Sequence, residues 1–108
     1  MDLCKVWTDI VAFNDIYFPD WRKTHLLYWT NALAGEVGEL CGDSKKLVGG
    51  GTHRKKPMPS KKKMMNELAD VFIYTVLLAE SEGVEQADFC KLVNNKMKEN
   101  KRRMEDDV

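Results

Sequence analysis

Two pairs of acidic residues, each pair three positions apart within an otherwise apolar helix-forming segment, constrain this chain more than any other feature. The pairs are Glu36/Glu39 and Glu67/Asp70, and residues three apart lie on the same face of a helix. In a symmetric antiparallel hairpin, opposed residues have a constant sum of residue numbers, which places Glu36 level with Asp70 and Glu39 level with Glu67. Four ionised carboxylates facing one another between helices require a cation, and a hard divalent ion such as Mg²⁺ takes oxygen ligands.

Length and charge bound the remaining possibilities. A chain of 108 residues is expected to form a single domain, 1–108. Its formal net charge of zero gives no indication that the protein binds polymeric nucleic acid or a membrane. The charge is uneven, however, because ranges 44–63 and 91–103 hold eight and six basic residues, with Glu99 as their single acid. Basic regions on either side of acidic helices are expected for a metal site that meets an anionic ligand.

The cysteines and the apolar runs indicate a cytoplasmic protein. Cys4, Cys41 and Cys90 are odd in number and far apart, without the spacing of a zinc site, so we expect buried, reduced thiols. The N-terminus lacks the charged-then-apolar pattern of a signal peptide. No apolar run approaches the roughly 18 residues that a membrane span needs. We therefore expect a cytoplasmic location and no membrane partner.

Apolar periodicity and helix-ending residues divide the chain into four predicted helices and no strand. The predicted ranges are about 2–16, from Asp20 or Thr24 to about 48, 60–82 and 85–104, with a fraying tail at 105–108. Ser60 is a good N-cap and Gly83 a good stop for the third helix. The predicted fold class is all-α and four-helix bundle-like.

Common alternatives compete with a metal site. A single Glu-x-x-Glu pair usually lies on a solvated face, and Glu82/Glu85, which spans the helix-breaking Gly83, is given no role. The two other pairs differ because their flanks are apolar. A di-iron carboxylate bundle would need Glu-x-x-His on two helices, and neither His25 nor His53 lies three residues after a glutamate.

Three motifs in chain order resemble a known family. Gly35-Glu-Val-Gly-Glu-Leu40 with Lys45-Lys46 soon after, then Glu67-Leu-Ala-Asp-Val-Phe-Ile-Tyr74, then Lys96-x3-Asn100-x2-Arg103 are similar to the elements of MazG-like, all-α nucleoside triphosphate pyrophosphohydrolases. That superfamily includes dCTPases and dimeric dUTPases. The resemblance runs from about residue 21 to residue 103 and implies an oligomeric MazG-type fold, either a homodimer or a homotetramer.

The resemblance also implies roles for particular residues. Glu36, Glu39, Glu67 and Asp70 resemble the ligands of Mg²⁺ or Mn²⁺, with Glu36 or Glu39 as the catalytic general base. Lys46, Lys96, Asn100 and Arg103 resemble phosphate-binding residues, although an ordinary charged surface is the alternative for the last helix. Tyr74 resembles an aromatic residue of the base pocket, for which core packing is the alternative. Trp21, His25 and Trp29 are further candidates for binding a base.

Two features depart from the family pattern. The loop from Gly49 to Ser60 is long and basic, and its Arg54, Lys55 and Lys56 either close over phosphates or remain solvated. The aromatic-proline sequence that usually follows the last-helix arginine is replaced by Met104-Glu105.

The implied activity is Mg²⁺-dependent hydrolysis of a (deoxy)nucleoside triphosphate to the monophosphate and pyrophosphate, in nucleotide-pool control or house-cleaning. Two other classes stay open. A non-catalytic nucleotide- or metal-binding bundle would bind its ligand without turnover, and a purely structural helical oligomer would show no effect of Mg²⁺ on thermal stability.

Overall fold

The computed structural model describes residues 2–49 and 59–106, and the regular structure in these ranges is all helical. This confirms the predicted all-α class. The elements are α1 (Leu3–Tyr17), the short 3-10 helix η1 (Trp21–Lys23), α2 (Leu26–Gly49), α3 (Lys61–Ser81) and α4 (Gln86–Asp106).

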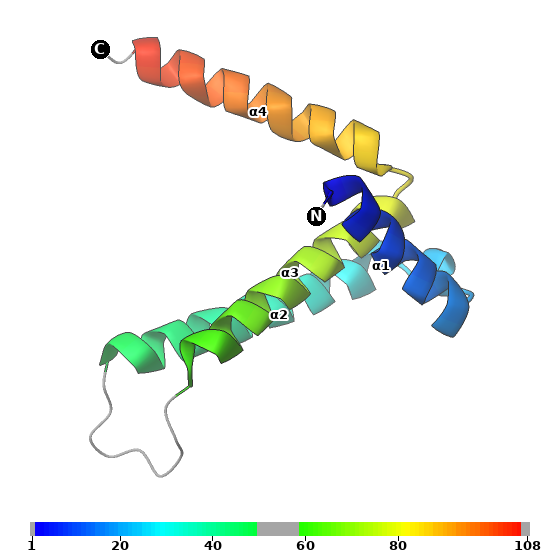
Figure 1. The fold of residues 1–108 in the computed structure, drawn as a ribbon, viewed down its shortest axis with the longest axis horizontal. Coiled ribbons are helices and arrows are strands. Elements are labelled where there is room, and N and C mark those ends of the chain that lie inside the picture. Colours follow the sequence, from blue (N-terminus) through cyan, green and yellow to red (C-terminus); the bar gives the residue numbers. More distant parts are fainter. Residues whose placement is uncertain (1, 50–58, 107–108) are drawn as a thin grey trace.

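An antiparallel hairpin of α2 and α3 forms the body of the molecule (Figure 1). Helix α1 packs on α3, across the end of the hairpin where α2 begins and α3 ends. Helix α4 leads away from the hairpin and contacts α1 through Phe89, whose ring centroid lies 5.4 Å from that of Trp7. Within the described part of one chain the helices do not close into a four-helix bundle, so the bundle remains a prediction.

Helix ends follow the expected chemistry at three places. The Asp2 carboxylate accepts the backbone N–H of Cys4 at 2.9 Å at the start of α1. At the start of α3 the Ser60 hydroxyl accepts the N–H of Lys63 at 3.1 Å, which confirms Ser60 as the N-cap. Helix α3 stops at Gly83, whose φ of 78° lies in the left-handed region where glycine is favoured.

The predicted start of the second helix is wrong. Neither Asp20 nor Thr24 caps the second helix, because residues 21–23 form a separate 3-10 turn and α2 begins only at Leu26. The His25 Nδ1 accepts the N–H of Leu27 at 3.0 Å and takes the capping role. Helix α4 extends past its predicted end at 104 to Asp106, with a Lys101–Glu105 ion pair in its last turn, and residues 107–108 of the predicted tail lie outside the described residues.

The cysteines are free thiols, but the expectation that all three are buried is wrong. Cys4 lies exposed in the first turn of α1, and Cys41 is exposed on α2, while Cys90 is half-buried on α4. Their positions on outer helix surfaces explain the difference, since the core of this small chain is formed by aromatic and aliphatic side chains instead.

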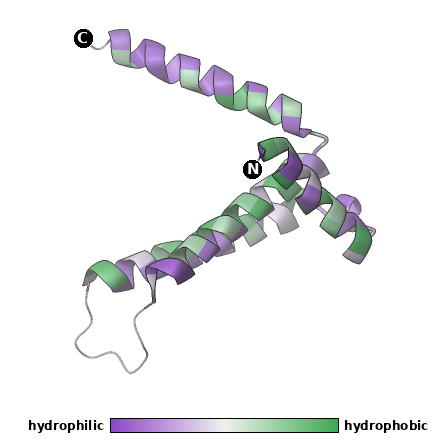
Figure 2. Cartoon of the chain, viewed as in Figure 1, coloured by the Kyte–Doolittle hydropathy of each residue, from purple (hydrophilic) through white to green (hydrophobic). Residues whose placement is uncertain are grey.

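Aromatic residues form the core at the end of the hairpin. Trp21, Trp29 and Leu77 make one buried cluster, in which the two indole rings meet edge to face at 5.9 Å. Figure 2 shows many apolar residues along α1, α2 and α3, whereas α4 is mostly hydrophilic with apolar residues interspersed. Across residues 2–49 and 59–106, no helix combines the length and apolar character needed to cross a bilayer.

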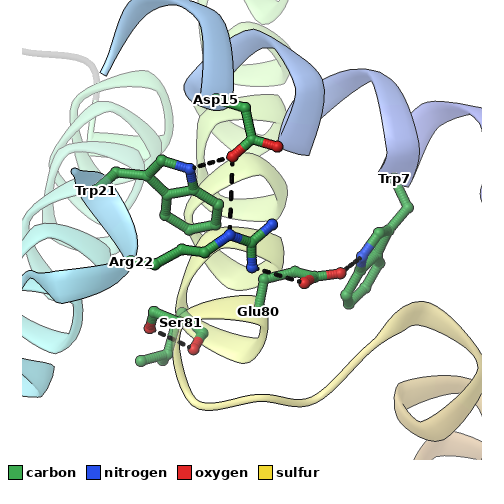
Figure 3. Close-up of polar contacts among 7 residues, drawn as sticks. Trp7, Asp15, Trp21, Arg22, Glu80 and Ser81 are labelled. Atoms are coloured by element: carbon green, nitrogen blue, oxygen red, sulfur yellow. Dashed lines mark hydrogen bonds and ion pairs between the residues drawn. The ribbon is translucent and has the colours of Figure 1, made fainter. Parts of the chain in front are cut away.

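A polar network fastens α1 and η1 to the end of α3 (Figure 3). The Trp7 indole N–H donates to Glu80 Oε1 at 2.7 Å, and Arg22 donates to Glu80 Oε2 at 3.2 Å. Arg22 also lies 3.7 Å from Asp15, which accepts the indole N–H of Trp21 at 2.8 Å. Glu80 is therefore the one residue of α3 in this network that holds both α1 and η1.

Replacing Glu80 with alanine is expected to destabilise the fold. The variant leaves the N–H of the buried Trp7 without an acceptor, which costs about 1–3 kcal/mol of the free energy of unfolding. Chemical denaturation of Glu80→Ala measures the loss, with the exposed Glu82→Ala as the matched control. Equal stability of the two variants would show that the network does not hold α1.

Candidate functional site

The four predicted carboxylates share one region of the α2–α3 hairpin. Glu67 is buried, with 8% of its surface exposed, whereas Glu36 is half-buried and Glu39 and Asp70 are exposed. Burial raises the pKa of Glu36 above its usual 4.5, and the charges of Glu39, Asp70 and Glu67 raise it further. The other three carboxylates therefore all lie close enough to Glu36 for their charges to act on it.

Glu36, Glu39, Glu67 and Asp70 form what we call the acidic face of the hairpin. A lysine and a fifth carboxylate extend it toward the end of the hairpin where α2 ends and α3 begins. Lys63 Nζ on α3 donates to Asp43 Oδ2 at 2.6 Å and to Glu67 Oε1 at 3.0 Å. Asp43, on α2, is 5% exposed. The hydrogen bond from Lys63 lowers the pKa of Asp43, and the hydrogen bond to Asp43 raises the pKa of Lys63. The pair is therefore fully ionised at neutral pH.

The second carboxylate oxygen of Glu67 is left without a partner. Glu67 Oε2 is buried and makes no hydrogen bond, although a buried carboxylate oxygen normally has one. A hard cation bound between the helices would satisfy this oxygen, so the donor set fits Mg²⁺ or Mn²⁺. Among residues 2–49 and 59–106, no three His, Cys, Asp or Glu side chains yet converge as a finished metal site. Side-chain rotation is therefore required for a cation to be held.

A large cavity lies beside the acidic face. Its volume is about 1010 Å³, and its walls come from α1, η1, the start of α2 and the middle of α3. Apolar and aromatic side chains line most of it, including Ile10, Phe13, Trp21, Tyr28, Trp29, Ile73, Tyr74 and Leu77. Asp70 also lines it and belongs to the acidic face, so the cavity and the carboxylates meet at this residue.

Two aromatic side chains that line the cavity carry polar groups with which a ligand could form hydrogen bonds. The indole N–H of Trp29 is buried without a hydrogen-bond partner, and Trp29 itself is 5% exposed. Burial raises the pKa of the Tyr74 hydroxyl, followed by the effects of Tyr28, Glu36 and Asp70. Tyr74 therefore stands between the cavity and the acidic face as a neutral hydrogen-bonding group.

The structure brings together only part of the predicted site. Trp21, Trp29 and Tyr74 line the cavity, but His25 does not, since its ring accepts the backbone of Leu27. Lys46 is exposed near the end of α2, and its charge acts on Asp43.

The predicted phosphate-binding residues of the last helix lie apart from the carboxylates. Lys96, Asn100 and Arg103 are exposed on α4, which leads away from the hairpin. Lys96 and Arg103 both pair with Glu99 on the same helix. The basic residues Arg54, Lys55 and Lys56 lie outside the described residues.

Sequence reasoning did not identify Asp43 and Lys63 as parts of the site. A signal was present, because Asp43 and Lys63 have the same sum of residue numbers as Glu36 with Asp70 and as Glu39 with Glu67. Asp43 also follows Glu39 by four residues, which continues the same helix face. The observed contact between Asp43 and Lys63 fits the predicted register of the hairpin.

The chain matches no protein-family model, and no curated protein or solved structure is significantly similar to it. A functional assignment therefore depends on the residues and geometry described above.

The repulsion at Glu36 predicts a pH-dependent effect on stability. Because its folded pKa is raised, ionised Glu36 destabilises the metal-free fold at pH 7, and this cost disappears as pH falls through the folded pKa toward 4.5. In a chelator, Glu36→Gln should melt on the order of 1–3 °C above the wild type at pH 7, with the difference closing near pH 4.5. The exposed Glu85→Gln is the control. A difference that is constant with pH would contradict the repulsion.

Proposed function

We propose that this protein is a nucleoside triphosphate pyrophosphohydrolase, which cleaves a (deoxy)nucleoside triphosphate between its α- and β-phosphates with Mg²⁺ or Mn²⁺. The observation that carries the proposal is that an acidic face on two antiparallel helices adjoins a large aromatic cavity through Asp70. A nucleotide needs both parts, since its base is an aromatic ring and its triphosphate is brought to carboxylates only through a divalent cation. The motif order in the sequence supports the same assignment.

Each part of the site has a role in this proposal. Glu67 and Asp70, with Glu36 or Glu39, would hold the cation, and Glu67 offers the oxygen that lacks a partner. When bound, the cation would neutralise negative charge on the phosphates and lower the pKa of a water molecule bound to it. Glu39 or Glu36 would accept the proton of the attacking water as general base. Attack at the α-phosphorus breaks its bond to the bridging oxygen and releases pyrophosphate.

The base would occupy the aromatic cavity. Tyr28 and Tyr74 would provide stacking surfaces, with the nearly buried Trp21 and Trp29 completing the aromatic wall, and aromatic stacking on a base contributes about 1–3 kcal/mol. The buried Trp29 N–H is a donor for a base carbonyl or ring nitrogen. This arrangement keeps the base in an apolar environment while the phosphates extend past Asp70 to the acidic face.

A second copy of the chain would complete the site. Lys96, Asn100 and Arg103 lie on α4, far from the carboxylates of their own chain (Figure 1). Helix α4 also exposes Leu92, Val93, Met97 and Met104. Packing of α4 on the hairpin of a partner would cover this apolar surface and bring basic groups to the departing pyrophosphate. The homodimer or homotetramer expected from the sequence remains part of this proposal.

A product assay tests the reaction. The protein with Mg²⁺ or Mn²⁺ is incubated with canonical and modified (d)NTPs, and products are separated by anion exchange. We expect monophosphate and pyrophosphate from one or a few substrates, and Glu39→Gln and Asp70→Asn should lower turnover by at least about 100-fold.

The exposed Glu85→Gln, outside the acidic face, is the control and should keep wild-type turnover. Diphosphate with orthophosphate would refute cleavage between the α- and β-phosphates. Mg²⁺-dependent nucleotide binding without any turnover would instead identify a non-catalytic nucleotide-binding protein.

Replacing Trp29 with phenylalanine tests the cavity as the base site. The variant keeps an aromatic ring but loses the N–H, so nucleoside monophosphate should bind about 3- to 10-fold more weakly, as expected for one lost hydrogen bond. Calorimetric titration measures the change, and Tyr17→Phe, an exposed aromatic residue outside the cavity lining, should bind like the wild type. An unchanged affinity in Trp29→Phe would place the base elsewhere.

A further inference from the structure

The contact of Lys63 with two carboxylates stands out within the acidic face. Its ammonium lies 2.6 Å from Asp43 Oδ2 and 3.0 Å from Glu67 Oε1, so it bridges α2 and α3. The two acceptors are nearly buried, whereas the lysine side chain is 56% exposed. Glu36, Glu39 and Asp70 lie on the same hairpin, and the charges of Glu39 and Asp70 act on Glu36. The ammonium thus supplies positive charge where the metal-free face needs it.

The same contact occupies one of the two carboxylate oxygens of Glu67. Lys63 engages Glu67 Oε1, while Oε2 stays buried without a partner. No three acidic side chains in the described ranges converge on one point. A divalent cation carries twice the charge of an ammonium and takes several oxygen ligands at once, so it would outcompete Lys63 for Glu67.

Asp43 is the partner that would retain the lysine if it left Glu67. The shorter contact of Lys63 is with Asp43, which lies one turn beyond Glu39 on α2. The lysine stem is flexible and half in solvent, so its ammonium can leave Glu67 without leaving Asp43. Displaced in this way, it would stay beside the bound cation, where a triphosphate has to lie.

We propose that Lys63, retained by Asp43, is a tethered cation that occupies the acidic face without metal and is displaced from Glu67 when a divalent ion binds. The inference rests on the proposed metal site and makes Lys63 a positioning residue. Its function would be to stabilise the metal-free protein, to set the affinity for the metal, and to keep a positive charge beside the phosphates.

Metal affinity provides the main test. Mn²⁺ and Mg²⁺ are titrated calorimetrically, without nucleotide, into the full-length wild type, Lys63→Met, Lys63→Arg and the control Lys62→Met, an exposed lysine one position away. Lys63→Met should bind metal about 3- to 10-fold more tightly, because no ammonium has to be displaced. Lys62→Met changes the net charge equally and should stay within about twofold of the wild type, and Lys63→Arg should restore wild-type affinity.

The melting temperature, measured by thermal unfolding in buffer that contains a chelator, provides a second test. Lys63→Met and Asp43→Asn should each lower the melting temperature, and the double variant should lose less than the two losses combined, because both remove the same contact. Circular dichroism confirms that each variant is folded. Additive losses would overturn the retention of Lys63 by Asp43.

The outcomes separate this inference from the proposed function. If the wild type binds metal and Lys63→Met binds it equally or more weakly, the tethered-cation role is refuted and the metal site stands. If the wild type binds neither Mn²⁺ nor Mg²⁺, the proposed metal site fails, and the inference fails with it.

Discussion

The antiparallel packing of α2 against α3 is the interaction on which the rest of the structure depends. It is fixed near both ends of the hairpin by different chemistry. At one end Trp29 and Leu77 are buried in an apolar cluster with Trp21, and at the other Lys63 bridges Asp43 and Glu67. Burial of apolar surface supplies most of the stability, whereas the charged contact fixes the register. A different register would separate Asp43 from Lys63 and bury a carboxylate without its partner.

The acidic face between these two ends stores electrostatic repulsion. Burial and three neighbouring carboxylates raise the pKa of Glu36, so the metal-free fold sacrifices some stability to keep these groups together. A purely structural helix pair would gain by replacing them with neutral residues. Repulsion of this kind is typical of functional sites, where it is relieved by a ligand of opposite charge.

The cavity arises from the way α1 and η1 cover one end of the hairpin. Glu80 near the end of α3 accepts hydrogen bonds from Trp7 of α1 and Arg22 of η1, which holds both elements over the aromatic cluster. The cavity is lined by side chains from four elements, and Figure 3 shows the polar network of Trp7, Arg22 and Glu80. Asp70 belongs both to this largely apolar space and to the acidic face, which gives the site one apolar and one charged half.

The sequence by itself determined the helices and their acidic face, because these depend on local periodicity and capping. The spacing of Glu36, Glu39, Glu67 and Asp70 was enough to place the carboxylates on one hairpin, and Ser60 and Gly83 marked the ends of α3. Only the tertiary structure decided what depends on contacts distant in the chain. These include the Lys63 bridge, the cavity wall formed by α1, and the course of α4 away from the hairpin. The start of α2 also escaped prediction, since the His25 ring, rather than Asp20 or Thr24, accepts a free N–H of its first turn, that of Leu27. Helix periodicity and capping hydrogen bonds depend on residues close together in the sequence. The relative placement of helices depends instead on which apolar surfaces pack against each other in the folded chain.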